Sequence, residues 1–301
     1  MEDLNLRAVS YDQLLREVSA ILPAGRRVGL TGPNGSGKTT LLRLLAGWLP
    51  WQSGGLSIGS QSQLGLPPER RGLSLLPAQP ALYSHWNVGQ NIAFPARSPG
   101  IPDQSQALVA DLELSGLAER KPHKLSQGER QRVAWARALN RPAPWLLADE
   151  ALAHLDGPQR QLLWTVLSRR WQGGLLLVTH QLQQDLPWLD QLYCLEQGRL
   201  RPVELSTLEQ NPGSSWLAGQ LRPENVWPGP LLGWGEGNWW VPPEAWRDDP
   251  AGSPAEWLER RGSLWKVSVH GRFIWLARPE AGGNLSPDPG LSAFLEASPA
   301  C

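Results

Sequence analysis

The stretch that decides the fold is Gly32-Pro33-Asn34-Gly35-Ser36-Gly37-Lys38-Thr39-Thr40, which fits the pattern G-x-x-x-x-G-K-[ST]. It follows the stretch Arg26-Arg27-Val28-Gly29-Leu30-Thr31, which is typical of a strand, and precedes a leucine-rich run at 39–49, typical of a helix. In that setting the glycines let successive backbone N–H groups point inward at a polyanion, and the helix start adds partial positive charge. Lys38 can reach terminal phosphates, and the Thr39 hydroxyl can bind Mg²⁺. We therefore predict that these residues form a phosphate-binding loop.

Outward from this loop, from residue 4 to about 210, short apolar runs alternate with helical stretches. This alternation predicts an α/β fold with a mostly parallel sheet covered by helices. Further strands are expected at 73–76, 145–148, 175–179 and 191–195, and helices at 107–114, 127–139, 158–170 and 182–189. Helical character dominates between residues 87 and 140, so we expect a helical subdomain beside the sheet.

The amino-acid composition changes after residue 210, where Asn211-Pro212-Gly213-Ser214-Ser215 is typical of a linker. Residues 264–277 alternate in polarity around His270-Gly271, which predicts a β-hairpin. We therefore divide the chain into residues 1–210 and a small, mostly β domain at 211–301.

Composition narrows the class of function. The 301 residues carry 28 basic and 28 acidic side chains, and this neutral balance disfavours a nucleic-acid partner. We find no run of about 18 uncharged apolar residues that could span a bilayer. An apolar leader is not evident at the N-terminus, and two distant cysteines predict neither a disulfide framework nor a metal site. We expect the reducing cytoplasm as the compartment.

Two further motifs carry chemistry of their own. Ser126-Gln127-Gly128-Glu129 opens an expected helix, where N–H donors and a hydroxyl can cap a phosphate. An apolar strand ends at Asp149 and Glu150. Asp149 is placed to offer the oxygen ligand that Mg²⁺ requires.

The phosphate-binding loop, the motif at 126–129 and the acidic strand end at 149–150 follow one another along the chain as they do in ATP-binding-cassette (ABC) ATPases, and the resemblance covers residues 4–210. Leu125–Ala134 is similar to the signature stretch of that family, and residues 144–150 to its Walker B strand. The resemblance implies bound ATP and Mg²⁺, with Glu150 polarising the attacking water and Lys38 on the phosphates. It also implies a head-to-tail dimer. In this dimer, the ATP bound by the opposite subunit would be contacted by Ser126 and Gly128, together with Gln127 and Glu129. That subunit would be a second copy of this chain or a related ATPase subunit.

The same resemblance assigns roles to four other positions. His180 matches the switch histidine that contacts the γ-phosphate, and Gln79 the glutamine that meets Mg²⁺ and the water. Asp156 matches the loop that follows Walker B, called the D-loop. Tyr11 is the candidate for stacking on adenine, with a core tyrosine as the alternative. The expected metal site is thus Thr39, Gln79 and Asp149.

Residues 67–71 and 91–95 resemble importer ATPases of the maltose, polyamine and ferric-iron types, whose C-terminal barrel is called TOBE. This implies transmembrane permease subunits, a solute-binding protein and a place at the cytoplasmic face of the cell membrane. Residues 211–301 are then a divergent TOBE-like domain or a partly ordered extension. An exporter subunit of the haem-export type, or a soluble ABC ATPase, remains the alternative function. The solute is not encoded in these motifs.

The signature departs from the family pattern at two positions. Gln127 replaces the usual second glycine, and Glu129 replaces the usual glutamine. Neither change removes a group that performs hydrolysis. We therefore expect activity to be retained, with slower or differently regulated closure as the open alternative.

Overall fold

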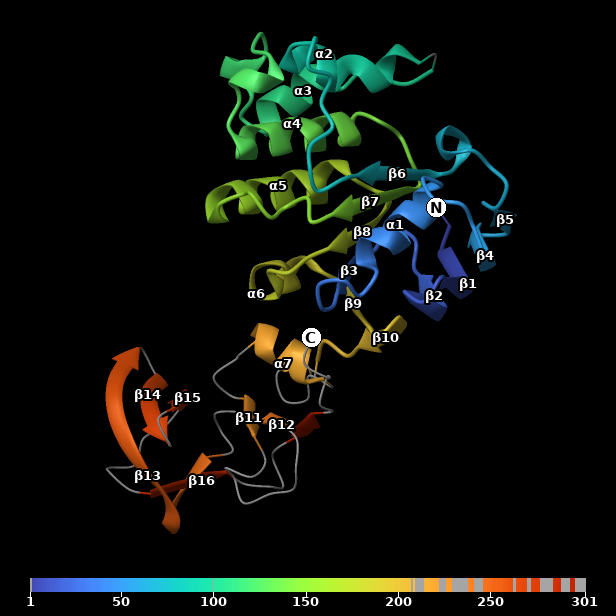
Figure 1. Cartoon of the computed structure of the whole chain (residues 1–301). Coiled ribbons are helices and arrows are strands. Elements are labelled where there is room, and N and C mark those ends of the chain that lie inside the picture. The colour runs from blue at the N-terminus through green and yellow to red at the C-terminus, as the bar shows by residue number, and fades with distance from the viewer. Residues whose placement is uncertain are drawn as a thin grey trace. The chain divides into compact units, whose positions relative to one another are not determined.

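The computed structural model describes residues 2–98, 100–206, 208 and 214–221, together with seven strand segments beyond residue 225 (Figure 1). The chain divides into two compact units, Met1–Pro202 and Val203–Cys301. Each unit is described by itself.

A six-stranded sheet in the order β10-β9-β3-β8-β7-β6 forms the centre of the first unit. Its strands are β3 (Arg27–Thr31), β6 (Leu73–Leu76), β7 (Trp145–Asp149), β8 (Gly174–Val178), β9 (Gln191–Glu196) and β10 (Arg199–Val203). The neighbours from β9 through β6 pair in parallel. Every residue of β7 and β8 is buried, as expected of parallel strands covered on both faces. The α/β fold class predicted from the sequence is confirmed.

The parallel order brings the carboxyl ends of the five strands from β9 to β6 to one edge of this sheet. The phosphate-binding loop follows β3, Glu150 follows β7, and His180 lies just beyond β8. Ligands bind in open α/β sheets outside this edge. Residues that are far apart in the sequence therefore meet here.

A second, antiparallel sheet has the order β2-β1-β4-β5 and was not among the expected strands. It contains β1 (Leu4–Tyr11), β2 (Leu15–Leu22), β4 (Ser53–Ile58) and β5 (Gln61–Ser62). Register shifts interrupt the pairing of β1 with both β2 and β4. Ala8 and Glu17 adopt positive φ values in these strands, which marks the bulges.

Six helices accompany the described sheets of the first unit. They are α1 (Lys38–Ala46), α2 (Val88–Ala93), α3 (Ser105–Asp111), α4 (Gln127–Leu139), α5 (Gly157–Arg170) and α6 (Leu182–Asp185). Short 3₁₀ turns lie at 68–70, 94–97, 115–117, 122–124 and 186–188. Helices α2, α3 and α4 contact one another and form the expected helical subdomain (Figure 1). None of the helices in the described part of the chain combines the length and apolar character needed to cross a membrane.

Three tryptophans are the largest fully buried side chains of the core: Trp135, Trp145 and Trp164. Trp145 sits at the start of β7, directly opposite Gly174 of β8. A Cβ at Gly174 would lie 2.5 Å from the Trp145 indole. The glycine therefore makes room for the ring inside the sheet.

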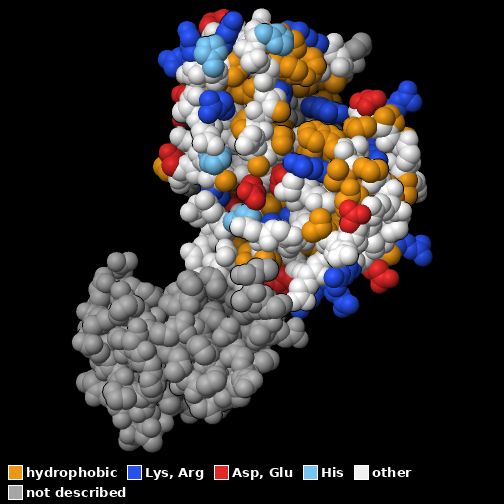
Figure 2. Space-filling view, in the orientation of Figure 1, with side chains coloured by type: hydrophobic (Ala, Val, Ile, Leu, Met, Phe, Trp, Pro, Cys, Tyr) orange, Lys and Arg blue, Asp and Glu red, His pale blue; other side chains and the backbone are white. Residues whose placement is uncertain are grey.

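On the face drawn in Figure 2, acidic and basic side chains are scattered among apolar and neutral ones.

The described segments of the second unit are one helix and seven strands. They are α7 (Ser215–Leu221), β11 (Val226–Pro228), β12 (Asn238–Trp240), β13 (Trp246–Arg261), β14 (Leu264–Val269), β15 (Arg272–Leu276), β16 (Asn284–Pro287) and β17 (Ala293–Leu295). The strands form two sheets, β11-β12-β17 and β15-β14-β13-β16. The expected hairpin is confirmed by the antiparallel pairing of β14 with β15, although its turn at 270–271 lies outside the described residues. Of the expected linker, 211–213 are also outside them, and Ser215 already begins α7. The domain boundary at 210 and the TOBE-like character stay predictions.

Candidate active site

The phosphate-binding loop takes its shape from glycines in the left-handed region of backbone conformation. Gly32 has φ +146° and Gly37 has φ +102°. A Cβ at Gly32 would lie 2.1 Å from the carbonyl oxygen of Leu195, so no other residue fits there. A Cβ at Gly37 would lie 3.0 Å from Leu15, which places the loop against the start of β2.

Lys38 lies in the hollow of this loop and is only 5% exposed. Its Nζ donates hydrogen bonds of 2.8 Å to the carbonyl oxygens of Gly32 and Pro33. Burial lowers the pKa of the lysine, while Glu150 and Asp149 act in the opposite direction. Among the described residues, the hydroxyl of Ser36 is buried in the same loop without a hydrogen-bond partner. A buried ammonium and a spare hydroxyl in a glycine-lined hollow fit a polyphosphate.

Thr39 and Asp149 meet across the edge of the sheet. The Thr39 hydroxyl donates to Asp149 Oδ1 at 3.1 Å. Burial, and then repulsion from Glu150, raises the pKa of the Asp149 carboxyl, whereas the Thr39 bond and the charges of Arg43 and Lys38 lower it. A hydroxyl beside a buried carboxylate is an oxygen donor set of the kind that Mg²⁺ prefers. The two residues therefore fit the expected cation.

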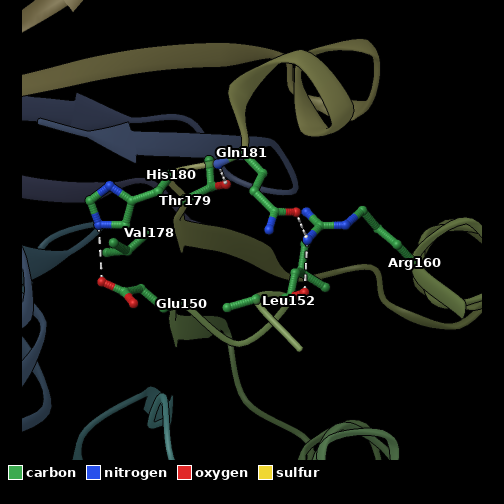
Figure 3. Close-up of a pocket in the computed structure, with 8 residues that line it drawn as sticks. Glu150, Leu152, Arg160, Val178, Thr179, His180 and Gln181 are labelled. Atoms are coloured by element: carbon green, nitrogen blue, oxygen red, sulfur yellow. Dashed lines mark hydrogen bonds and ion pairs between the residues drawn. The ribbon is translucent and has the colours of Figure 1, made fainter. Parts of the chain in front are cut away.

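Glu150 stands next to this pair and faces His180. Its Oε1 lies 3.0 Å from His180 Nε2 (Figure 3). An ionised carboxylate only accepts hydrogen bonds, so this contact requires the histidine tautomer with hydrogen on Nε2. The backbone of Glu150 has φ +49°, and its N–H donates to the Val178 carbonyl oxygen at 3.2 Å. The left-handed turn re-aims the side chain from the end of β7 toward β8.

A cavity of about 70 Å³ opens beside the Glu150–His180 contact. The turn at 150–153 lines one side of it and the segment 178–181 the other, with Arg160 completing the lining (Figure 3). Both titratable side chains of the contact border this space. The cavity is large enough to hold water.

The motif at the start of α4 forms a capping box. Ser126 Oγ accepts a hydrogen bond of 3.2 Å from the Glu129 N–H, and Glu129 Oε2 accepts one of 2.6 Å from the Ser126 N–H. The bond from the Ser126 backbone is the main cause that lowers the pKa of Glu129. Gln127 is exposed. The glutamate in place of glutamine thus fixes a negative charge at the helix N-terminus.

The starts of α4 and α5 lie against each other. A Cβ at Gly128 would lie 2.8 Å from Gln159 Oε1 and 3.3 Å from the His154 carbonyl oxygen. Asp156 is the N-cap of α5, accepting a bond of 2.9 Å from the Gln159 N–H. The expected signature and D-loop residues are therefore neighbours in the structure. Both lie far from the phosphate-binding loop in the sequence.

The positions of two expected site residues, Tyr11 and Gln79, do not by themselves indicate a role in binding. Tyr11 ends β1, is half-buried and packs against the hydrophobic core, so it shares the character of a core tyrosine. Gln79 is exposed on the loop after β6, the neighbour of β7 in the sheet. The roles of both residues stay predictions.

A buried ion pair that no motif in the sequence indicates lies beside the cavity. Arg160 Nη1 donates to both carboxylate oxygens of Asp185, at 2.8 and 2.9 Å, and the two side chains are 3% and 0% exposed. Asp185 also accepts from the Thr179 hydroxyl at 2.6 Å and from Trp164 Nε1 at 3.2 Å. The only signal in the sequence is that Asp185 interrupts an otherwise uncharged stretch at 181–189.

Comparison with known proteins identifies the family. The sequence profile described as "ABC transporter" matches residues 15–153. The thiamine import ATP-binding protein ThiQ of Shigella sonnei is 38% identical over 182 residues, 58% of this chain and 78% of that protein. This chain belongs to the ABC transporter family. The resemblance of its motifs to ABC ATPases is thereby confirmed.

Other relatives of this ABC protein are longer than the matched region. The Fe(3+) ions import ATP-binding protein FbpC of Pseudomonas fluorescens is 37% identical over 64% of this chain and 58% of its own length. The spermidine/putrescine import ATP-binding protein PotA of Fusobacterium nucleatum is 32% identical over 76% and 64%, respectively. The chain thus spans less than two thirds of these two relatives.

Solved structures agree with the ABC fold. A dimeric ATP-binding cassette in a post-hydrolysis state with ADP and Pi superposes with a TM-score of 0.60 at 24% identity, covering 67% of this chain and 98% of that one. An ATP-bound Atm1-family ABC exporter gives a TM-score of 0.63 at 27% identity, covering 73% of this chain and 41% of that one. The fold of this chain is thus found both in that ATP-binding cassette and in an ABC exporter.

Proposed function

We propose that this protein hydrolyses ATP as the nucleotide-binding subunit of an ABC importer. The observation that carries the proposal is the contact of Glu150 with His180, one residue from the Thr39–Asp149 pair. An acid–base pair, a cation-type donor set and a polyphosphate hollow then share one edge of the sheet.

The residues divide the work of binding. Lys38 would exchange its two carbonyl partners for terminal phosphate oxygens, and the N–H groups at the start of α1 would face the same anion. Thr39 and Asp149, with Gln79 approaching from the loop after β6, would hold Mg²⁺. When bound there, Mg²⁺ supplies positive charge that offsets the charge of the phosphates. Tyr11 would stack on the adenine.

Glu150 performs the hydrolytic step in this proposal. Its carboxylate takes a proton from the attacking water, whose oxygen bonds to the γ-phosphorus as the bridging bond to the β-phosphate breaks. The products are ADP and inorganic phosphate. His180 holds the carboxylate through Nε2 on one side of the cavity. It can also donate to a γ-phosphate oxygen when released from Glu150.

A second subunit would complete the site. The signature residues Ser126, Gln127, Gly128 and Glu129 and the neighbouring Asp156 lie on adjoining helix starts. In a head-to-tail dimer, this surface would face the ATP of a second copy or of a related ATPase subunit.

The importer assignment rests on the names of the relatives, which are import ATP-binding proteins for iron, spermidine/putrescine and thiamine. We propose that transmembrane permease subunits hold this protein at the cytoplasmic face of the cell membrane. A solute-binding protein would deliver the solute on the other side. The similarity to an ATP-bound exporter keeps the export alternative as an outcome of the test.

The test of hydrolysis is Glu150→Gln. We expect turnover to fall by roughly 100-fold or more because the water loses its base, while Mg-ATP still binds and a stable dimer accumulates. Turnover is measured by phosphate release and dimerisation by light scattering. Glu17→Gln is the matched control, since Glu17 has φ +50° and is exposed on β2. Normal turnover in Glu150→Gln would contradict the assignment of Glu150 as the catalytic base.

Import is tested with the membrane subunits that co-purify from detergent-solubilised membranes. After reconstitution in vesicles, ATP turnover should rise when the solute-binding protein is added to the side opposite this chain. Turnover that responds to a solute without a binding protein, with transport in the outward direction, would indicate the exporter instead.

A further inference from the structure

The buried Arg160–Asp185 pair forms hydrogen bonds with the chain segments on both sides of the Glu150–His180 contact. Asp185 accepts from the Thr179 hydroxyl, the residue before His180. Thr179 Oγ1 in turn accepts from the N–H of Gln181, the residue after His180, at 3.0 Å. The histidine is thus bracketed by two residues whose positions depend on one carboxylate.

The second amino group of the same guanidinium reaches the other side of the cavity. Arg160 Nη2 donates to the Leu152 carbonyl oxygen at 2.8 Å, two residues beyond Glu150, and also to the Gln181 side chain (Figure 3). Leu152 belongs to the turn that begins at Glu150, where the Ala153 N–H bonds the Glu150 carbonyl oxygen at 3.0 Å. One planar group therefore joins the turn after Glu150 to the segment that carries His180.

We propose that Arg160, held by Asp185, is a positioning residue that sets the separation of Glu150 from His180. This rests on the proposed function, because it assigns the spacing a role in ATP hydrolysis. The guanidinium acts through its rigid fork, with one arm fixed on the carboxylate and the other bridging the two segments. Neither Arg160 nor Asp185 needs to touch the nucleotide.

Arg160→Lys separates positioning from simple stability. A lysine ammonium can keep the ion pair with Asp185, but its single nitrogen cannot also bridge Leu152 and Gln181. We expect kcat to fall roughly 10- to 100-fold, with KM for ATP unchanged within about twofold, since the phosphate-binding loop is not altered. In nucleotide-free protein, amide hydrogen exchange should rise in residues 151–155 and 179–182.

The matched control is Arg71→Lys. Arg71 is also a buried arginine, 8% exposed, whose guanidinium donates to the carbonyl oxygens of Leu66, Leu44 and Leu45 at the far end of α1. Its replacement should lower the melting temperature and leave kcat unchanged. Equal losses of kcat in both variants would show that stability alone is at work, which would overturn the proposal.

Gln181→Ala provides a second variant whose folding is not in question, because Gln181 is exposed. It removes one end of the bridge, and we expect kcat to fall roughly threefold to tenfold at constant KM. Wild-type kcat in both Arg160→Lys and Gln181→Ala would overturn the positioning role. With Glu150→Gln assayed beside them, loss of turnover in that variant alone would leave the proposed function standing, whereas normal turnover in it would remove the proposed function itself.

Discussion

At the scale of single residues, the negative charge of Glu129 is the clearest peculiarity of the site. The capping box holds this carboxylate against the N-terminus of α4, where the helix dipole would otherwise favour phosphate. Two anions would then compete for the same positive helix end during closure of the proposed dimer. We therefore expect the charge to oppose closure of the proposed dimer without removing any group proposed for hydrolysis.

Glu129→Gln should therefore tighten ATP-induced dimerisation by about two- to five-fold, the range expected for one charge at a helix terminus. The effect should shrink as salt is added, because salt screens exposed charges. The bond from the Ser126 N–H lowers the pKa of Glu129, so the charge persists from pH 8 down past the ordinary value for glutamate. The gain should accordingly stay constant between about pH 8 and pH 6.

Dimerisation is measured by sedimentation in the Glu150→Gln background, where turnover does not reverse it. Glu17→Gln in the same background is the control. A variant at position 129 that dimerises more weakly than its parent would show that the carboxylate supports closure instead of opposing it.

At the scale of elements, the parallel strands of the central sheet and helix α4 could be predicted directly from the sequence. Strands β6 to β9 appear in the sequence as continuous apolar runs, and α4 as a periodic run behind its cap. The antiparallel sheet was not specified because bulges at Ala8 and Glu17 interrupt the two-residue alternation of its strands. Residues 248–254 contain two prolines and a glycine, which are typical of turns, yet they lie within β13, where the register against β16 shifts.

The candidate site divides in the same way. Its motif residues could be named in advance because their chemistry is local: a glycine loop, a strand end, a helix cap. Arg160 and Asp185 could not, since their pairing depends on how α5 and α6 pack across the end of β8.

Gly174→Ala tests the packing of β7 on β8. The added methyl group would meet the rigid Trp145 ring at 2.5 Å, so the free energy of unfolding should fall by about 1–3 kcal/mol. Urea denaturation followed by circular dichroism measures this change. Gly157→Ala is the control, because a Cβ there meets nothing within 4 Å at the first position of α5. A neutral Gly174→Ala would mean that the indole can move aside.

At the scale of the whole molecule, all the expected site residues lie in the unit Met1–Pro202. Binding to the native state alone raises stability by mass action, by about 2.7 kcal/mol when the ligand is at 100 times its Kd. Mg-ATP should therefore raise the melting temperature of the intact protein, and Lys38→Ala should abolish the increase. Differential scanning calorimetry measures both. An equal increase in Lys38→Ala would place nucleotide binding elsewhere in the chain.

The backbone of Glu150 has a further consequence, which concerns the balance between stability and activity. A glutamate at φ +49° is held in a conformation that glycine or asparagine adopts with less strain. The fold sustains that strain at the residue that we propose as the catalytic base. Selection for thermal stability alone would therefore favour replacing Glu150 with glycine or asparagine. A screen for thermostable variants of this protein must also measure ATP turnover, because it would otherwise select inactive variants.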